Sequence, residues 1–273
     1  MVVFTGVKKR SLSKLKGISA EDIKSIHEEG RWVKKFGKKE VVLVLYTSGK
    51  LLLQGDLELK EKVAGQLREL KVGEEVKLVD FKAVRGWVIG SDESLKGDTF
   101  GGLVVAGVKA NDNIRKQLRE LGVADSKKLA DKEILIMAEK VKKIGGCYVL
   151  NVFPEEYNTE VRKGNLTKLM NKLHQEVYDY LKPGKHIVDK FPGCYVGEIA
   201  ETKAEDKYLE VAAASVVARA AALKQLDALS AKAGFLLPKG STHVKMALHE
   251  LKERKLDFKE FVKVDFKNVR EFL

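Results

Sequence analysis

The stretch Arg85-Gly-Trp-Val-Ile-Gly-Ser-Asp-Glu-Ser-Leu-Lys-Gly-Asp98 places two adjacent carboxylates, Asp92 and Glu93, between an apolar run and a glycine-containing turn. The apolar run predicts the end of a buried strand and residues 103–108 predict the next strand, so we expect the acids beside a hairpin. Adjacent acids at the edge of a core repel each other unless cations or solvent neutralise them. A solvated acidic turn and a metal site are therefore both open, and acids elsewhere in the chain decide between them.

The composition limits the class of protein. The 273 residues suffice for one large domain or two unequal ones. A net charge of +12 and a pI near 9.4 favour a polyanionic partner. The two cysteines, Cys147 and Cys194, are far apart, which argues against a disulfide scaffold and fits a reducing cytoplasm. The five histidines have no metal-ligand spacing with them, so a zinc site is not expected.

Targeting and assembly signals are weak in this sequence. No apolar stretch approaches the length needed to cross a membrane, and residues 1–16 lack the apolar core of a signal peptide. We therefore expect a cytoplasmic protein that does not bind membranes. Nothing in the sequence implies an obligate protein partner, and a monomer is expected.

The chain is predicted to divide into residues 1–75, a linker at 76–85 and a larger part at 86–273. The first part has the pattern of a small α+β domain with a curved antiparallel sheet. The residues Ser19–Asp22 predict a helix cap, and the helix they begin would end at Gly30. The other expected elements are strands at 32–36, 40–46 and 51–54 and a helix at 57–70.

The opening segment is strongly basic. Residues 1–39 contain eleven Lys/Arg and four acids, a net +7 of the chain's +12. A solvated surface is the ordinary explanation for such lysine runs. However, Trp32 and Phe36 alternate with Lys34 and Lys35, and aromatic rings stack on bases while lysines bind phosphates. This pattern favours a nucleic-acid-binding face.

The second part alternates strands with helices, which predicts an α/β domain with one mixed sheet flanked by helices. Strands are expected at 87–91, 103–108, 146–153 and 186–189. Helices are expected at 111–121, 131–143, 154–182 with a break at Gly164, and 208–233, with further helices after them.

Four acids follow a common pattern in this second part. Asp92 and Glu93 end one predicted strand, Asp189 ends another, and Glu205 precedes the alanine-rich helix. If the first and fourth strands are neighbours, these side chains meet at one edge of the sheet. Oxygen ligands without His or Cys suit Mg²⁺ or Mn²⁺. Two such ions, roughly 3.5 to 4 Å apart, could activate a water and stabilise the leaving oxygen in phosphodiester cleavage.

Four motifs together resemble a type 2 ribonuclease H. They are Gly90–Gly102, Asp125–Leu129, Val188–Phe191 and Glu201–Arg219, and they follow the order of that family across the second part. Within the type, the chain looks most like ribonuclease HIII. That subgroup has an N-terminal domain resembling the TATA-box-binding protein fold, and its fourth catalytic acid is Glu where the ribonuclease HII branch has Asp.

The resemblance implies an endoribonuclease that hydrolyses the RNA strand of RNA/DNA hybrids and leaves 5′-phosphate and 3′-hydroxyl ends. It implies that Asp92, Glu93, Asp189 and Glu205 bind two Mg²⁺ or Mn²⁺ ions and form the catalytic set. Asp206, beside Glu205, is assigned instead to an interaction with the helix dipole.

The family reads the RNA strand through a turn directly after the Asp-Glu pair, normally Gly-x-Gly. By resemblance, Ser94, Leu95, Lys96 and Gly97 form that substrate-binding turn here. Leu95 departs from the pattern, and a left-handed backbone at leucine would cost roughly 1–2 kcal/mol. We therefore expect either a differently built turn or altered recognition of the substrate.

Further substrate contacts are expected from two loops. Asp125 suits a helix cap, while the resemblance places Ser126, Lys127 and Lys128 beside the substrate backbone. Lys239 lies in a loop that could bind a phosphate, although a turn followed by a helix cap explains that loop almost equally well. His174 is interpreted as a core or solvated histidine rather than a catalytic one.

Three other functions remain open at this stage. The first is nicking at single ribonucleotides embedded in DNA, as in the ribonuclease HII branch, which uses a tyrosine late in the domain. This chain has no tyrosine after Tyr208, which favours cleavage within RNA. The others are a non-catalytic hybrid-binding protein, which the four acids argue against, and a DNA-directed nuclease of the same superfold.

Overall fold

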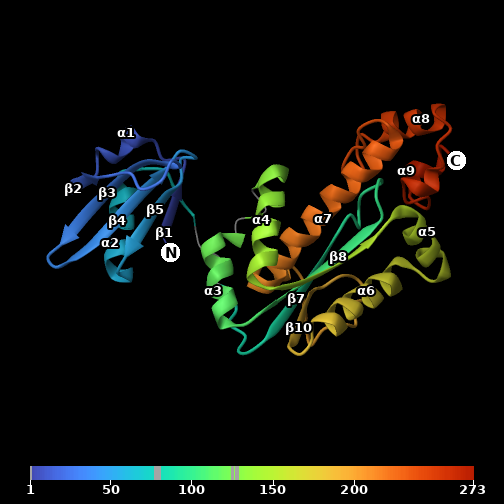
Figure 1. The fold of residues 1–273 in the computed structure, drawn as a ribbon, viewed down its shortest axis with the longest axis horizontal. Coiled ribbons are helices and arrows are strands. Elements are labelled where there is room, and N and C mark those ends of the chain that lie inside the picture. The colour runs from blue at the N-terminus through green and yellow to red at the C-terminus, as the bar shows by residue number, and fades with distance from the viewer. Residues whose placement is uncertain (1, 77–80, 124–125, 127–128) are drawn as a thin grey trace. The chain divides into compact units, whose positions relative to one another are not determined.

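The computed structural model describes residues 2–76, 81–123, 126 and 129–273. The chain forms two compact units, Met1–Val79 and Asp80–Leu273 (Figure 1). None of the helices in the described ranges is long and apolar enough to cross a membrane.

The first unit is a six-stranded antiparallel sheet with a helix packed on it. The strand order is β2-β3-β4-β5-β1-β6, and the longer helix, α2, contacts β1, β4, β5 and β6. Asp56 begins α2, because its side chain accepts hydrogen bonds from the backbone nitrogens of Glu58 and Leu59. The elements are β1 Val2–Thr5, α1 Lys9–Leu12, β2 Ile18–Glu21, β3 Glu28–Phe36, β4 Lys39–Tyr46, β5 Leu51–Gly55, α2 Leu57–Glu69 and β6 Glu74–Val76.

The strands and the helix expected at residues 32–70 are confirmed, but the helix expected from residue 19 to 30 is wrong. Ile18–Glu21 is a strand, paired with β3 from Ile18↔Lys34 to Glu21↔Arg31. The two isoleucines meant to form the apolar face of that helix are 52% and 92% exposed, at Ile23 and Ile26. A helix there would have had nothing to pack against, whereas pairing with β3 satisfies the backbone.

The aromatic rings that were expected to stack on bases also belong to the core of the first unit. Trp32 and Phe36 are partly buried and pack against the core that contains α2. Residues two apart on a strand point to the same side of the sheet, so Lys34 lies on that side as well. Its ammonium donates to Gln66 Oε1 of α2 at 2.7 Å. These rings therefore contribute to the core, and stacking of their exposed parts on bases stays a prediction.

The second unit has a five-stranded mixed sheet in the order β11-β10-β7-β8-β9. β7 pairs in parallel with β10 and antiparallel with β8, so the first and fourth predicted strands are neighbours, as expected. The elements of the sheet and its helices are β7 Val88–Ser94, β8 Leu103–Ala110, α3 Asp112–Leu121, α4 Asp131–Ile144, β9 Gly146–Val152, α5 Pro154–Lys163, α6 Leu166–Leu181, β10 Lys185–Asp189, β11 Ile199–Glu201, η2 Ala204–Asp206 and α7 Leu209–Ala233.

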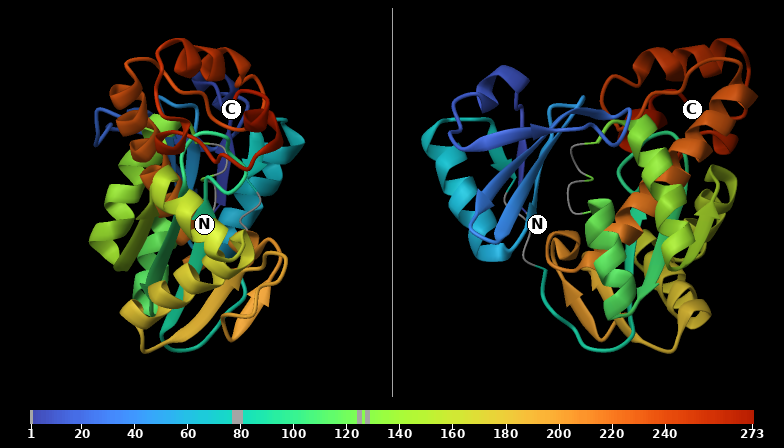
Figure 2. Two further views of the ribbon diagram at one scale, coloured as in Figure 1. Left: turned by 90° about the vertical axis from the view of Figure 1, so that its right-hand side faces the viewer. Right: turned by 60° about the vertical axis from the view of Figure 1, so that its left-hand side comes forward.

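Helices cover both faces of this sheet (Figures 1 and 2). On β8, Val104 and Ala106 pack in the core that contains α7 and α4, while Leu103 and Val105 pack in the core that contains α6. The close approach of α7 requires a glycine on β7, because a β-carbon at Gly90 would lie 2.3 Å from the backbone nitrogen of Val211. The chain then closes with α8 Lys245–Glu253, η3 Phe258–Glu260 and α9 Lys267–Arg270.

β7 is longer than its apolar pattern predicted. The strand was expected to stop at residue 91, but pairing with β8 continues through Asp92↔Ala106 and Glu93↔Val105 to Ser94↔Val104. The two carboxylates therefore lie within the strand and not after it. Apolar periodicity missed this extension because polar side chains occupy the last three positions of the strand.

Candidate active site

The structure brings the four predicted acids into one region at the end of the second unit's sheet. Asp92 and Glu93 lie on β7, and Asp189 is the last residue of the neighbouring strand β10, where Val188 pairs with Ser91. Glu205 lies in η2, directly before α7. The ends of two parallel strands and the entrance to one helix thus supply all four side chains.

Asp92 is the most strongly perturbed of these acids. Its side chain is buried, with 7% of the residue exposed. Burial, together with the negative charges of Glu93 and Asp189, raises the pKa of Asp92 to about 8. A hydrogen bond with Ser215 of α7 and one from the backbone nitrogen of Glu93 at 2.8 Å act in the opposite direction. The carboxyl of Asp92 therefore lies where negative charge is poorly compensated.

Asp189 shares this environment. Burial raises its pKa above the usual value, and the charges of Glu205 and Glu93 add to the effect. The backbone nitrogen of Ala204 donates to Asp189 Oδ1 at 2.8 Å and partly offsets it. This bond also ties the end of β10 to η2, and so it sets Asp189 beside the segment that carries Glu205.

Glu93 differs from the two aspartates. Burial by itself would raise its pKa, but His174 and Lys96 outweigh burial and hold the pKa of Glu93 below the usual value. Lys96 Nζ lies 2.5 Å from Glu93 Oε1, and His174 Nε2 lies 3.4 Å from Glu93 Oε2. Glu93 is therefore ionised, with Lys96 bonded to Oε1 and His174 facing Oε2.

The donor atoms and charge of this cluster fit a divalent cation. As placed in the described part of the chain, the side chains do not gather three ligands about one point, since Glu93 contacts Lys96 and His174 instead. Nevertheless, burial and the negative charges of neighbouring acids raise the pKa of both Asp92 and Asp189, and a bound cation would offset that repulsion. Carboxylate oxygens are the ligands that Mg²⁺ and Mn²⁺ prefer.

Glu201, another acid close to Glu205 in sequence, is engaged elsewhere. Lys82 donates to its carboxylate at 2.6 Å, Tyr208 at 2.5 Å and Lys207 at 2.9 Å. These three partners, Lys82 foremost, lower the pKa of Glu201 to about 2. Glu201 therefore fixes the segment around η2.

The turn after Asp92 and Glu93 has a left-handed backbone at Leu95, the residue that stands where the family normally has glycine. Leu95 has φ +67°, and its side chain is buried in the core of the second unit. The backbone of the turn therefore has the left-handed conformation that the family's glycine would adopt. Burial of the Leu95 side chain offsets the strain of this conformation. Gly97 is open, because a β-carbon there would meet nothing within 4 Å.

Of the other predicted substrate residues, Lys239 lies near this turn and Ser126 is held by α7. A cavity of about 210 Å³ is lined by Ser94, Leu95 and Lys239 among others. Lys239 forms an ion pair with Asp131, which also accepts from Arg219 at 2.9 Å. Arg219 in turn donates to the Ser126 carbonyl at 3.4 Å. Lys127 and Lys128 lie outside the described residues.

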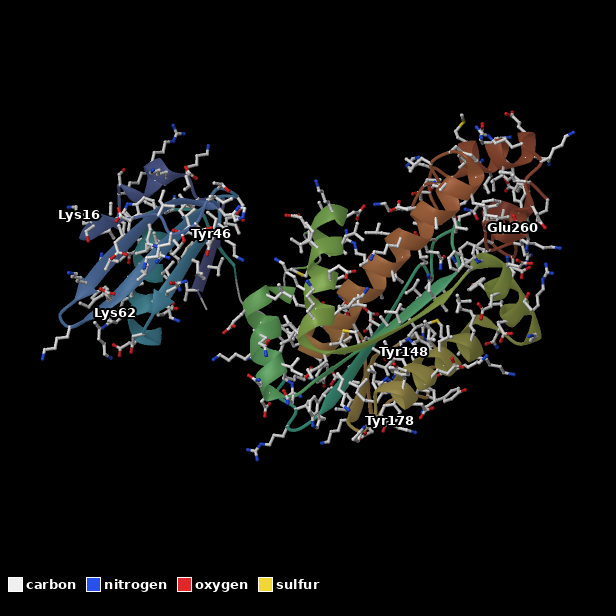
Figure 3. The ribbon with its side chains drawn as sticks, in the orientation of Figure 1. Lys16, Tyr46, Lys62, Tyr148, Tyr178 and Glu260 are labelled. Atoms are coloured by element: carbon white, nitrogen blue, oxygen red, sulfur yellow. The ribbon has the colours of Figure 1, made fainter. Side chains whose placement is uncertain are left out.

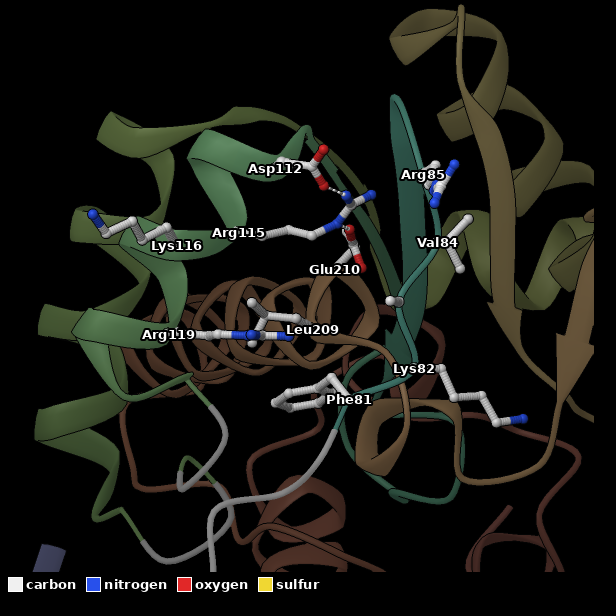
Figure 4. A pocket seen from close by; sticks show the side chains of 11 residues that line it. Phe81, Lys82, Val84, Arg85, Asp112, Arg115, Lys116, Arg119, Leu209 and Glu210 are labelled. Carbon is white, nitrogen blue, oxygen red and sulfur yellow. Dashed lines mark hydrogen bonds and ion pairs between the residues drawn. The ribbon is translucent and has the colours of Figure 1, made fainter. Parts of the chain in front are cut away.

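A second cavity, of about 330 Å³, lies beside α3 (Figure 4). Arg115 crosses it and forms ion pairs with Glu210 at the start of α7 and with Asp112. Its third contact is the carbonyl of Gly86, at 3.1 Å. The buried guanidinium thus joins α3, α7 and the segment that leads into β7.

Sequence reasoning missed the contacts of one buried polar residue in this unit, His174, and the burial of another, Lys263. His174, which was assigned to core or solvent, contacts both Glu93 and Ser91. Lys263 is fully buried and donates to the carbonyls of Asp98 at 2.6 Å and Gly101 at 2.9 Å. No local pattern marks either residue, because their partners are 81 or more positions away in the chain.

The fold and the clustered acids can be compared with known families. A family model described as Ribonuclease HII matches residues 89–269. The chain belongs to that family, the type 2 ribonucleases H, and is therefore a hydrolase.

Proteins named ribonuclease HIII match over most of the length of this chain. The protein of Lactococcus lactis subsp. cremoris is 32% identical over 265 residues, which is 88% of this chain and 87% of that one. The Bacillus pumilus protein is 33% identical over 84% of this chain and 85% of its own. The predicted resemblance to ribonuclease HIII is confirmed.

Solved structures support the same assignment. The structure of Bst-RNase HIII in complex with Mn²⁺ has a TM-score of 0.64, 25% identity and coverage of 100% of this chain and 98% of that one. Aquifex aeolicus RNase H3 has a TM-score of 0.60, 28% identity and coverage of 97% and 100%. The two-part architecture, an antiparallel sheet domain followed by a mixed-sheet domain with helices, is therefore that of ribonuclease HIII structures.

Proposed function

We propose that this chain is an endoribonuclease that cuts the RNA strand of RNA/DNA hybrids with two Mg²⁺ or Mn²⁺ ions held by Asp92, Glu93, Asp189 and Glu205. The observation that carries the proposal is the environment of Asp92, a buried carboxyl whose pKa is raised to about 8 by burial and by two neighbouring acids. The similarity to Bst-RNase HIII, which was solved with Mn²⁺, supports the choice of cation.

Each acid has a defined part in this proposal. When bound, two ions supply activation of the attacking water and stabilisation of the leaving oxygen. Asp92 and Asp189, on adjacent parallel strands, would be shared by both ions, and Glu93 and Glu205 would complete one each. Cleavage then releases a 5′-phosphate on one fragment and a 3′-hydroxyl on the other.

The turn at residues 94–97 is proposed to read the RNA strand. The left-handed backbone at Leu95 turns the chain directly after the acids, and the open surroundings of Gly97 leave room for a ribose to approach. The 2′-hydroxyls of the minor groove distinguish RNA from DNA. Lys96, Ser126, Lys127, Lys128 and Lys239 are proposed to contact the substrate backbone.

The first unit is proposed to hold the duplex through its charge. Its residues 1–39 carry a net +7, and lysines near α1 such as Lys8 and Lys9 are exposed. Figure 3 shows Lys16 on the same unit. Cationic surfaces bind phosphate backbones without reading the bases, which suits a domain that increases affinity and leaves chemistry to the second unit.

The decisive experiment uses paired substitutions of neighbouring acids. Asp92→Asn is expected to abolish cleavage of an end-labelled RNA/DNA hybrid in Mg²⁺ or Mn²⁺ while binding of the hybrid persists. Glu205→Gln is expected to lose most activity, whereas Asp206→Asn, its matched control, keeps it. Robust cleavage by the Asp92 variant would refute the site.

The same assay separates the alternative functions. DNA/DNA, RNA/RNA and DNA with one ribonucleotide are compared with the hybrid. The proposal expects cleavage within RNA stretches of the hybrid. A preference for the single ribonucleotide would indicate activity like that of ribonuclease HII, and binding without cleavage would indicate a hybrid-binding protein.

We also propose that the enzyme works in the cytoplasm as a monomer. Cys147 and Cys194 are both free in the structure, which suits a reducing compartment. All four acids and the turn come from one chain. Size-exclusion chromatography with light scattering tests the monomer, and a mass near twice 30.5 kDa would contradict it.

A further inference from the structure

Three buried polar side chains next to the acids form a hydrogen-bonded series, which we call the positioning chain: His186, Ser91 and His174. Ser91 on β7 and His174 on α6 are fully buried, and His186 on β10 is 2% exposed. Ser91 Oγ lies 2.8 Å from His174 Nδ1 and 2.8 Å from His186 Nε2. His186 is also covered by Tyr178 of α6, whose ring stacks on it with 5.0 Å between the ring centroids. The chain therefore links the two acid-bearing strands to the helix that covers them.

One end of this chain reaches Glu93. His174 Nε2 and Glu93 Oε2 are 3.4 Å apart, both are buried, and neither has a hydrogen-bond partner among the described residues. A buried donor and a buried carboxylate oxygen that face each other satisfy one another if the nitrogen carries a proton. With a lone pair at Nε2 instead, two electron-rich atoms would face each other in a buried space.

The position of the proton on His174 then determines which group donates in the Ser91–His174 and Ser91–His186 hydrogen bonds. With its ring proton on Nε2, His174 has a lone pair at Nδ1 and accepts the hydroxyl proton of Ser91. Ser91 Oγ in turn accepts from His186 Nε2. Burial lowers the pKa of His186 to about 3, which keeps that ring neutral. Every donor in the chain thus points toward Glu93.

The two oxygens of Glu93 are held unequally. His174, on Oε2, is completely buried and anchored by Ser91, while the side chain of Lys96, on Oε1, is 41% exposed. An exposed lysine can leave its partner at little cost, but a buried histidine cannot. Oε1 is therefore the oxygen that Glu93 can offer to another cation.

We infer that Ser91, His174 and His186 form a positioning chain that fixes the Glu93 carboxylate for metal binding, with His174 keeping Oε2 while Lys96 yields Oε1. This inference rests on the proposed function in one respect, namely that Glu93 is a metal ligand. The three residues are buried, and in this inference they act on the metal site through Glu93. Partners that orient a ligand in this way typically change metal affinity or activity ten- to a hundred-fold.

The test measures binding of Mn²⁺ alone by isothermal titration calorimetry, together with the Mn²⁺ dependence of hybrid cleavage, on the full chain. His174→Phe keeps a ring of similar size and removes both nitrogens. It is expected to weaken Mn²⁺ binding about ten-fold or more, with much of the cleavage rate regained at saturating Mn²⁺. His174→Gln places an amide N–H near the position of Nε2 and is expected to restore most of the affinity.

Two further variants separate positioning from packing. Ser91→Ala removes the link with minimal change in volume and is expected to weaken Mn²⁺ binding to an intermediate degree. Val177→Ala, on the same helix and fully buried, lowers stability without removing a hydrogen bond and is expected to leave Mn²⁺ affinity unchanged. If His174→Phe does not fold, the Ser91→Ala and His174→Gln results carry the test.

Three outcomes would overturn the inference. The first is unchanged Mn²⁺ affinity in His174→Phe or, where that variant does not fold, in Ser91→Ala. The second is an equal loss of Mn²⁺ affinity in His174→Phe and His174→Gln, and the third is a matching loss of affinity in Val177→Ala. Failure of the proposed function looks different, because Asp92→Asn would then still cleave. An inactive Asp92→Asn beside a His174→Phe variant with normal Mn²⁺ binding would reject only the positioning chain.

Discussion

The side chain of Leu95 fills the space above Gly101, so that a β-carbon at Gly101 would lie 2.9 Å from Leu95 Cδ1. Leu95 at φ +67° and Gly101 at φ +81° are both left-handed, and each depends on the other. The leucine is tolerated in a backbone conformation suited to glycine because the glycine opposite leaves room for its side chain.

Replacing Leu95 tests this balance. Leu95→Ala keeps the left-handed strain and loses the packing, so we expect a loss of about 2–5 kcal/mol in the free energy of unfolding. Leu95→Gly relieves the strain and should be more stable than the alanine variant, the reverse of the usual order. Urea unfolding monitored by circular dichroism measures both.

Leu95→Gly should also affect recognition. We expect Mn²⁺ binding to be unchanged and the cleavage rate, or the preference between hybrid and single-ribonucleotide duplexes, to shift, because a glycine turn is freer to adjust to the ribose. Identical cleavage of both duplexes by the two proteins would show that the leucine only stabilises the turn.

The buried ion pair between Arg115 and Glu210 should behave as a unit. Arg115→Met leaves Glu210 buried without its main partner, and we expect a loss of about 3–5 kcal/mol in the free energy of unfolding. The double variant Arg115→Met/Glu210→Met should recover a large part of that loss. Chemical denaturation of the single and double variants provides the measurement, and strict additivity would contradict the coupling.

Lys263 should make stability depend on pH. Burial lowers its pKa to about 7, whereas the unfolded chain keeps the ordinary value of 10.5. Between pH 7 and pH 10.5, Lys263 is largely deprotonated in the folded state and protonated in the unfolded state. The free energy of unfolding therefore rises with pH in this range. We expect stability to increase from pH 7 to pH 9 by up to about 1.4 kcal/mol per pH unit. Lys263→Met should flatten this slope in thermal unfolding, and an unchanged slope would exclude Lys263 as its source.

The basic first unit should make hybrid binding depend on salt. In a test variant of the full chain, the exposed residues Lys9 and Arg10 are both changed to Glu. We expect this variant to bind the hybrid more weakly and to show a shallower dependence of log Kd on log salt concentration. The matched control reverses two exposed charges of the second unit's last helix, Lys267 and Arg270. Equal effects of the two pairs, measured by fluorescence anisotropy, would mean that the first unit is not the principal duplex-binding surface.

The second unit was predicted well from sequence because its strands have apolar runs, its longest helix, α7, is rich in alanine, and its acids lie at recognisable places. The pairing of β7 with β10, expected from the acids at their ends, is present. Weaker local signals misled at Ile18–Glu21, where pairing with β3, the next strand of the chain, overrode a helix cap. The helix prediction failed there because strand pairing, which local sequence preferences do not reveal, decided the structure.

The site's supporting residues could not have been predicted by the same means. Ser91 is separated from His174 by 83 positions and from His186 by 95, and each residue on its own has the pattern of an ordinary core position. Likewise, nothing local distinguishes Lys263 from the exposed lysines around it. Only the folded arrangement shows which polar groups share a buried space.

The order of the strands has a consequence for synthesis of the protein. β10 lies between β7 and β11, yet it follows β9 in the chain, so Asp189 and Glu205 join Asp92 and Glu93 only after most of the second unit has been made. A polypeptide that has left the ribosome only as far as β9 carries two of the four acids. The proposed set of four acids is therefore complete only once Glu205 has been synthesised, late in the translation of the messenger RNA, with α7, α8 and α9 still to follow.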